Sequence, residues 1–587
     1  MIDEKKLRSP RPDFYREDWF DLNGEWEFSF DDDHKGMGED WFKTHSFDKK
    51  IQVPFCYQSK LSGIHDTTRH PYVWYSKKVT LPKNMADKRI WLNFGAVDYK
   101  TMVWIDGRFA GEHKGGHTSF AFEITDFIKK EEFRITVFCE DSYDIAQPRG
   151  KQHWNEKTDR CWYTATTGIW QSVWLEATRS TKIERILITP DIDKKQVEIN
   201  LRTSEHITEG ILEWKVSFKG TIVKEGNVHL NAKDTRFLIS MENPDPIDNL
   251  VHLWSPENPE LYDLELKLKQ KEITCDFVES YFGMRKIEID GSHILLNHYP
   301  LYQKLILDQG YWEESLMTPP DVEALVKDIR LVTEMGFNGV RKHQKVEVPA
   351  FLYLADCMGI LVWEEMPSNY RFSEDGMIAL QREYEEMILR DYNHPSIITW
   401  VPLNESWGVR DILWDKKQQN FATSLYYMTK AIDDTRIVST NDGWETVTSD
   451  LVGIHDYESN GMAFYEKYKD RDKLLQWTAV GKMIYADGFS YKGEPVLISE
   501  FGGVAFEDGN KENWGYNEKA SDEKEFLERL SKLWEAIEKL DYVEGYCYTQ
   551  LTDVEQETNG LLYPDRTPKV PIEKIQEIIF GKNKPEI

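Results

Sequence analysis

The chain has 587 residues, 40% of them hydrophobic and 13% aromatic, which is enough apolar material for about three or four folded domains and excludes a disordered chain. Its formal net charge of -29 at pH 7 and its pI near 5.0 disfavour contact with phosphate backbones and anionic membrane surfaces. We therefore expect no nucleic-acid and no membrane partner, and a neutral ligand.

Cysteine spacing and the first residues bear on the cellular compartment. The six cysteines are widely spread and form no C-x-x-C pair, so neither a zinc site nor a disulfide framework is supported. The segment Met1–Lys6 lacks the apolar core of a signal peptide, and no run approaches the ~18 apolar residues of a membrane span. We predict a cytoplasmic protein with reduced thiols.

Short strands with a period of two dominate the first half of the chain. In residues 1–180, segments such as Gly24–Phe30 and Arg89–Phe94 alternate with turns rich in Gly, Asp and Asn, which predicts a β-sandwich. Residues 181–285 continue with strands such as Gln196–Leu201, and their length suits one immunoglobulin-like sandwich.

From residue 286 to residue 587 strands and helices alternate, which is typical of a parallel sheet covered by helices. Helices are predicted over Pro320–Val332, begun by Thr318 or the prolines, and over Pro349–Cys357. Eight strands in such a span match a single (β/α)₈ barrel. The predicted strands are 305–307, 339–341, 360–363, 397–403, 436–440, 451–454, 496–498 and 543–548.

Two glutamates stand at the ends of predicted barrel strands, where such barrels display their catalytic groups. Glu405 follows the fourth strand and Glu500 follows the seventh. A carboxyl pair can share the work of protonating a leaving group and attacking an anomeric carbon without a metal or an organic cofactor. The pair predicts hydrolysis of a glycosidic bond with no cofactor and no metal; the alternative is two ordinary strand-end glutamates.

A series of short motifs runs along the whole chain in a fixed order. They are Leu22–Trp26, Val53–Pro54, Trp74–Tyr75, Thr167–Gln171, Asn393–Ile397, Asn404–Glu405, Ser499–Gly502, Asn559–Leu561 and Arg566–Lys569. Each alone is weak, but the ordered set resembles glycoside hydrolase family 2, the family of β-galactosidases, β-glucuronidases and β-mannosidases. The resemblance implies a jelly-roll sugar-binding-like domain at 1–180, an immunoglobulin-like β-sandwich at 181–285 and a catalytic TIM barrel at 286–587.

The resemblance also implies roles for individual residues. Glu405 matches the family's general acid/base and Glu500 its nucleophile, in a mechanism that retains the anomeric configuration. Asn404 matches the residue that hydrogen-bonds the sugar 2-hydroxyl, Tyr457 matches a tyrosine that hydrogen-bonds the nucleophile, and Arg341 resembles an arginine that keeps the nucleophile ionised. A turn asparagine and a core tyrosine are the alternatives for the first two of these three.

Four further positions are candidate sugar ligands or subsite walls. His343 departs from the family pattern, because many relatives carry a small-residue pair before this histidine, and an interior histidine is equally compatible. Asp308 could bind sugar hydroxyls or form an Asx turn. Trp407 and Tyr548 could line a subsite or simply pack in the barrel.

The sugar is predicted from two local departures. β-Glucuronidases of the family place Asn-x-Lys after the eighth strand, whereas this chain has Glu557–Gly560; β-mannosidases more often show Asn-Asn-Glu, whereas Leu403–Ser406 is closer to the galactosidase-like branch. We expect an exo-acting β-galactosidase-like enzyme and a carbohydrate substrate. The alternatives are a β-glucuronidase, galacturonidase or β-mannosidase, and a catalytically silent carbohydrate-binding protein. A homo-oligomer is expected from the family alone.

Overall fold

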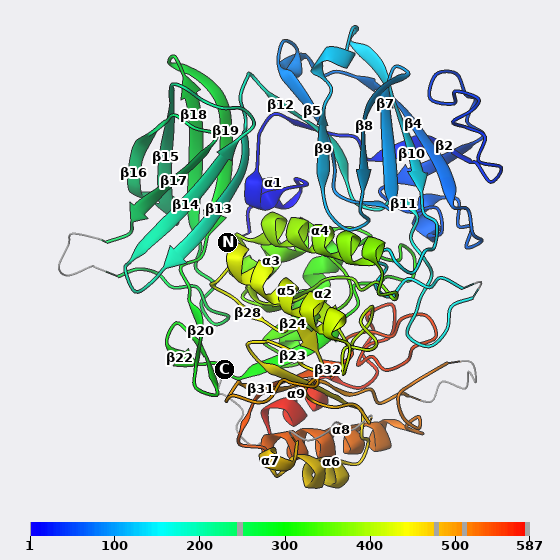
Figure 1. Ribbon diagram of the computed structural model, residues 1–587, viewed down its shortest axis with the longest axis vertical. Helices are drawn as coiled ribbons and strands as arrows, with labels where there is room; N and C mark the ends of the chain where they lie inside the picture. The colour runs from blue at the N-terminus through cyan, green and yellow to red at the C-terminus, as the bar shows by residue number, and fades with distance from the viewer. Residues whose placement is uncertain (1, 156, 243–249, 475–480, 507–512, 582–587) are drawn as a thin grey trace.

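The computed structural model describes residues 2–155, 157–242, 250–474, 481–506 and 513–581, which fold into three domains in chain order. Figure 1 shows the first domain in blue and cyan beside the second domain in green, with the third domain below both. This is the predicted fold class: a jelly-roll sandwich, an immunoglobulin-like sandwich and a TIM-like barrel.

The first domain packs two antiparallel sheets around one apolar core. Alternate residues point inward, as in Gly24–Phe30, where Trp26 and Phe28 are buried in the core. One sheet has the order β1 (Trp19–Asp21), β12 (Val173–Thr178), β5 (Arg89–Phe94) and β9 (Phe120–Glu123), and the other β3 (Lys49–Val53), β2 (Gly24–Phe30), β4 (Tyr72–Thr80), β10 (Glu132–Glu140), β7 (Lys100–Ile105) and β8 (Arg108–Lys114).

The second domain is a smaller sandwich with the same alternation. Val197, Ile199 and Leu201 of one sheet share a core with residues such as Leu264 and Leu266 of the other. The strand order of one sheet is β13 (Ile183–Asp191), β14 (Gln196–Thr203) and β17 (Asp234–Ser240). The strand order of the other is β16 (Thr221–Leu230), β15 (Gly210–Phe218), β18 (Tyr262–Gln270) and β19 (Ile273–Phe282).

Eight parallel strands form the third domain, and all eight predicted strands are present. In sheet order they are β28 (Ile437–Val438), β26 (Ile397–Val401), β25 (Leu361–Glu365), β24 (Gly339–Lys342), β23 (Gln303–Asp308), β32 (Val543–Thr549), β31 (Val496–Gly502) and β30 (Val452–Asp456). Helices cover the outside of this sheet (Figure 1): α2 (Val322–Glu334), α3 (Pro349–Met358), α4 (Glu374–Asp391), α5 (Lys416–Ile432), α6 (Gly461–Tyr468), α8 (Glu523–Glu538) and α9 (Ile572–Phe580).

Three boundaries differ from the prediction. The fourth barrel strand ends at Val401, and a separate short strand, β27 (Leu403–Asn404), pairs with β29 (Asn441–Asp442). The seventh strand continues past Ile498, because its backbone pairs with both β30 and β32 as far as Phe501, so Glu500 lies inside a strand. Helix α2 is capped by Asp321, whose side chain accepts a 2.8 Å hydrogen bond from the amide of Ala324.

A long segment of the first domain, residues 141–167, leaves the sandwich after β10 and runs to the carboxyl end of the barrel strands. The amides of Arg149 and Gly150 donate to the carbonyl of Ser368 at 2.9 and 3.0 Å. The side chain of Gln556 in turn donates to the carbonyls of Arg160 and Trp162 at 2.7 and 3.0 Å. The first domain therefore forms part of the barrel mouth.

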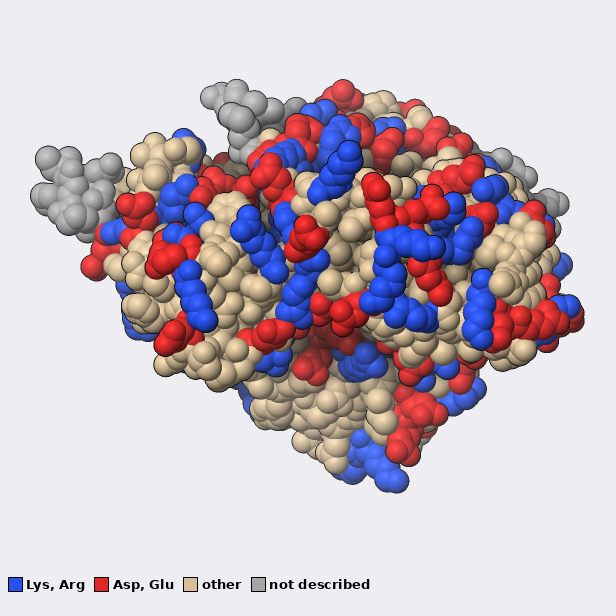
Figure 2. All heavy atoms as spheres, turned by 90° about the horizontal axis from the view of Figure 1, so that it is seen from above, with Lys and Arg blue, Asp and Glu red and all other residues tan. Residues whose placement is uncertain are grey.

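The distribution of surface charge and the length of the helices are relevant to the prediction of no nucleic-acid and no membrane partner. In the view from above, acidic and basic side chains are interspersed over the visible face, so the negative net charge is not gathered into one patch there (Figure 2). Within the described ranges, no helix is both long enough and apolar enough to cross a lipid bilayer.

Candidate active site

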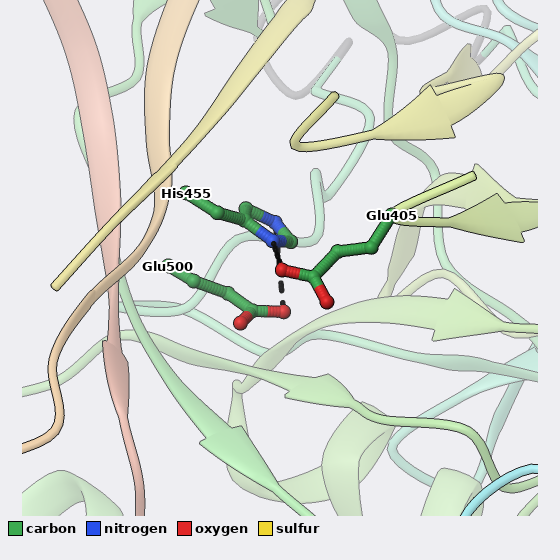
Figure 3. Close-up of side chains that lie close together, drawn as sticks. All are labelled: Glu405, His455 and Glu500. Carbon is green, nitrogen blue, oxygen red and sulfur yellow. Dashed lines mark hydrogen bonds and ion pairs between the residues drawn. The ribbon is translucent and has the colours of Figure 1, made fainter. Parts of the chain in front are cut away.

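Glu405, His455 and Glu500 meet at the carboxyl end of the barrel strands. Figure 3 shows the carboxylate ends of Glu405 and Glu500 turned toward each other, with the His455 ring beside both. One donor atom from each of the three side chains lies within 4.8 Å of the other two. The two glutamates predicted from separate strands are therefore close enough to act on one bond.

The backbone turns sharply at Glu405. Glu405 and Ser406 have φ values of 50° and 56°, in the left-handed region that non-glycine residues seldom adopt. The turn is held by the Glu405 amide, which donates to the Asp442 carbonyl at 2.9 Å, and by the Ser406 amide, which donates to Asn441 Oδ1 at 2.9 Å. It presents the Glu405 side chain, 16% exposed, at the opening above Glu500, which is 4% exposed.

Glu500 is surrounded by groups that favour its ionised form. Arg341 Nη1 lies 3.0 Å from Oε1, His455 Nε2 lies 3.5 Å from the same oxygen, and the Tyr457 hydroxyl donates to Oε2. Burial alone would raise the pKa of Glu500, but the charges of His455 and Arg341 outweigh burial and lower it. The carboxylate is therefore ionised at neutral pH.

His455 carries a positive charge in this site. Burial alone would lower its pKa, but the charge of Glu500 and the hydrogen bonds to Asp442 and Glu405 raise the pKa to about 10. Nδ1 donates to Glu405 Oε1 and Nε2 donates to Asp442 Oδ2, both at 2.9 Å. The imidazolium thus links the two glutamates.

The same three side chains form a group with metal-binding donor types, but its protonation does not suit a metal. Both ring nitrogens of His455 carry a proton at neutral pH, so neither offers a lone pair. The donor set of the described residues fits a hydrogen-bonded pair of carboxyl groups better than a metal site.

Arg341 connects these groups below the site. Its Nε donates to Glu365 Oε2 at 2.7 Å, and its Nη2 donates to Asn404 Oδ1 at 2.7 Å. Burial alone would raise the pKa of Glu365, but Arg341 lowers it to about 2. The side-chain oxygen of Asn404 thus accepts from Arg341, whereas its buried amide nitrogen has no hydrogen-bond partner among the described residues. A buried free donor beside Glu405 is available to a ligand.

His343 and Trp407 lie together beside the two glutamates, with ring centroids 6.3 Å apart. His343 Nδ1 is 3.1 Å from Glu365 Oε1, and burial lowers its pKa, so the ring is neutral at pH 7. Trp407 is partly exposed and contacts the rings of Trp162 and Tyr370, with centroids 6.0 and 5.4 Å away. An aromatic wall therefore adjoins Glu405.

Two predicted residues do not face the pocket. Asp308 is engaged by the protein: Lys342 Nζ lies 2.6 Å from Oδ2, and the Gly310 amide donates to Oδ1 at 2.8 Å, which is the Asx-turn alternative. Tyr548 is fully buried and stacks on Trp534 of α8, with centroids 5.1 Å apart. Neither is arranged to touch a ligand above Glu500.

His455, Asp442, Glu365 and Lys151 also surround the two glutamates and were not predicted from the sequence. Three of them had a usable signal, because Glu365 ends β25, His455 is the last residue but one of β30, and Asp442 follows β28. Lys151 had no such signal, since it belongs to an irregular segment of another domain.

Comparisons with known proteins agree with this architecture. The model of the glycosyl hydrolases family 2 sugar binding domain matches residues 20–178, that of glycosyl hydrolases family 2 matches residues 181–285, and that of the family's TIM barrel domain matches residues 287–582. A solved structure, an uncultured Clostridium sp. β-glucuronidase, has a TM-score of 0.77 at 22% identity and covers 96% of this chain and 98% of that chain. This likeness shows the shared fold.

Two curated relatives carry different names. A β-galactosidase of Thermoanaerobacter pseudethanolicus is 29% identical over 345 residues, which are 57% of this chain and 44% of that protein. A β-glucuronidase of Streptococcus agalactiae is 25% identical over 421 residues, which are 66% of this chain and 66% of that protein. The chain thus spans less than two thirds of the length of either relative.

Proposed function

Because the chain belongs to glycosyl hydrolase family 2, we propose that it is a retaining, exo-acting β-glycosidase with Glu500 as nucleophile and Glu405 as acid/base. The observation that carries this proposal is the approach of the two side chains, because one carboxyl oxygen of Glu405 lies within 4.8 Å of one of Glu500. Retaining enzymes hold their carboxyl groups about 5–5.5 Å apart, whereas inverting enzymes leave about 6.5–9.5 Å for a water molecule.

The charges of the two glutamates suit the two steps. In the first step the Glu500 carboxylate forms a bond to the anomeric carbon while the glycosidic bond breaks and Glu405 gives its proton to the departing oxygen. In the second step Glu405 takes a proton from water, whose oxygen replaces Glu500 at the anomeric carbon. The low pKa of Glu500 and the greater exposure of Glu405 support this assignment.

Neighbouring side chains would hold the sugar and the nucleophile. The free amide of Asn404 can donate to the 2-hydroxyl, a contact that strengthens toward the transition state. Tyr457 holds one oxygen of Glu500 and leaves the other facing Arg341. His343 and Trp407 are proposed to line the sugar site.

The glycone that we propose is a terminal β-galactoside or a related neutral sugar. A uronate carboxylate in this site would meet the negative charge of Glu500, and also that of the buried Glu557 when this group is ionised. Relatives named β-galactosidase and β-glucuronidase both match the chain, so the preference for a neutral sugar rests on the charges of the site and on the sequence Leu403–Ser406.

The test is hydrolysis of a panel of nitrophenyl β-glycosides by wild type, Glu500→Gln and the control Glu535→Gln, whose side chain is exposed on α8. We expect activity that is lost in Glu500→Gln, is kept in the control, and releases the β-anomer first when followed by NMR. Release of the α-anomer would refute retention. A folded wild type that cleaves no glycoside would favour the silent carbohydrate-binding alternative.

A further inference from the structure

Lys151 reaches the catalytic pocket from the first domain. It lies in the segment 141–167, where its carbonyl accepts a 2.7 Å hydrogen bond from the Tyr163 amide and so fixes its position. Its ammonium lies 4.9 Å from the centroid of the Trp407 ring, and Trp407 follows Glu405 by two residues. The side chain therefore reaches the residues that follow the proposed acid/base in the chain.

The ammonium is buried without an ion pair. Lys151 is 3% exposed, and no carboxylate of the described ranges lies within 4.0 Å of its nitrogen. Burial raises the pKa of the neighbouring Cys161 thiol to about 12, so this thiol is neutral at pH 7. Among the described residues the side-chain hydrogen-bond partner of the ammonium is this thiol, a weak acceptor, so a bound ligand can supply a stronger hydrogen-bond partner to the buried cation.

The charge of Lys151 persists because acidic groups stand further off. Burial alone would lower its pKa, but neighbouring acidic groups raise it: Cys161 where its thiol is ionised, and the carboxylates of Glu557, Glu500 and Glu405. The ammonium therefore lies within electrostatic reach of both Glu405 and Glu500, and it contacts the Trp407 ring beside Glu405.

The overall charge of the pocket favours a neutral sugar beneath this ammonium. With Glu405 protonated for its acid role, the charges of the described site balance or leave an excess of one negative charge, depending on whether Glu557 is ionised. The groups counted are the acids Glu365, Glu405, Asp442, Glu500 and Glu557 and the cations Arg341, His455 and Lys151. A hydroxyl oxygen accepts a hydrogen bond from Lys151 without adding negative charge.

We propose that Lys151 is a specificity-determining residue that donates a hydrogen bond to one hydroxyl of a neutral, non-reducing sugar. The inference rests on the proposed glycosidase function and adds a contact from outside the barrel. It makes the jelly-roll domain a part of the sugar site itself.

The test compares wild type, Lys151→Met and the control Lys157→Met, an exposed lysine of the same segment. The substrates are the nitrophenyl β-glycoside that wild type cleaves best and its 2-, 3-, 4- and 6-deoxy analogues, together with the matched β-uronide. We expect Lys151→Met to lower kcat/KM on the parent glycoside by about 10- to 100-fold, as for the loss of a hydrogen bond from a charged donor. On the one analogue that lacks the contacted hydroxyl, the same substitution should lower kcat/KM by less than about 3-fold. Thermal unfolding checks that the variant is folded.

Three results would separate the possibilities. An equal loss on the parent and on every analogue would overturn the inference, because Lys151 would then act on the protein alone. A β-uronide cleaved faster than its neutral counterpart, with the advantage lost in Lys151→Met, would replace the hydroxyl with a carboxylate and also overturn it. A folded wild type without activity on any substrate would instead refute the proposed function.

Discussion

His455 is the group whose replacement most directly tests the electrostatics of the site. We consider His455→Asn, which removes the imidazolium and leaves a neutral side chain. His455 Nε2 lies 3.5 Å from Glu500 Oε1, and after burial its charge is the largest influence on the pKa of Glu500. Since that charge favours the ionised carboxylate, its loss raises the pKa of Glu500.

The size of the effect follows from the geometry. Two unit charges 3.5 Å apart interact by about 5 kcal/mol at an effective dielectric constant near 20. Arg341 remains 3.0 Å from the same oxygen, and water entering the vacated space increases the screening, so we expect about a third of this energy to appear. That corresponds to a rise of about one pH unit or more in the pKa of Glu500.

The assay is kcat/KM against pH on a nitrophenyl β-glycoside that wild type cleaves. The acidic limb of this profile reports the group that must be deprotonated in the free enzyme, here the proposed nucleophile Glu500. In wild type it should lie below the ordinary glutamate value of 4.5, and in His455→Asn it should move to higher pH. The control is His206→Asn in the second domain, whose side chain is exposed. An acidic limb unchanged by His455→Asn would refute the coupling of His455 to Glu500.

Two further substitutions test the supports of the site. Tyr457→Phe removes the hydroxyl that donates to Glu500 and should lower kcat by about 10- to 100-fold, whereas Tyr427→Phe, on an exposed ring, should not; equal kcat in both would contradict a role for the hydroxyl. Gly150→Ala should lower kcat/KM by about 10-fold or more, because Gly150 has a φ of 58° and a Cβ there would lie 2.3 Å from the Gln344 carbonyl, displacing the segment that carries Lys151. Gly220→Ala, at a φ of 80° with open space around it, is the control, and full activity of Gly150→Ala would show that the segment adapts.

The barrel strands were predictable because most are continuous apolar runs. Segment Ile397–Val401 is buried at every position, and its nearly unbroken run of apolar residues predicts that both faces of the strand are buried. The end of β31 was not predictable in this way. Ser499 and Glu500 are polar, and they remain in the strand because neighbouring backbones pair with them, a contact made by segments distant in sequence.

Side-chain direction explains which candidates reached the pocket. Tyr546 and Tyr548 share one face of β32 and both contact Trp534 outside the barrel, whereas Cys547 between them lies in the core inside it. The alternation of a strand could therefore have placed Tyr548 on the outer face. Asp308 is different, since only the fold brings Lys342 to its carboxylate.

The contribution of the first domain to the site could not be predicted in this way, because the segment that reaches the barrel shows no helix or strand periodicity in its sequence. Residues 141–167 are held by backbone and side-chain hydrogen bonds to the barrel, among them Trp162 Nε1 to the Tyr370 hydroxyl at 2.8 Å and the Tyr163 hydroxyl to Glu557. Both contacts lie beside the pocket. The arrangement fixes an irregular segment by polar contacts to a rigid barrel, which is how loops position functional groups. Variation in this segment could therefore change which sugar is accepted while Glu405, Glu500 and Arg341 stay unchanged.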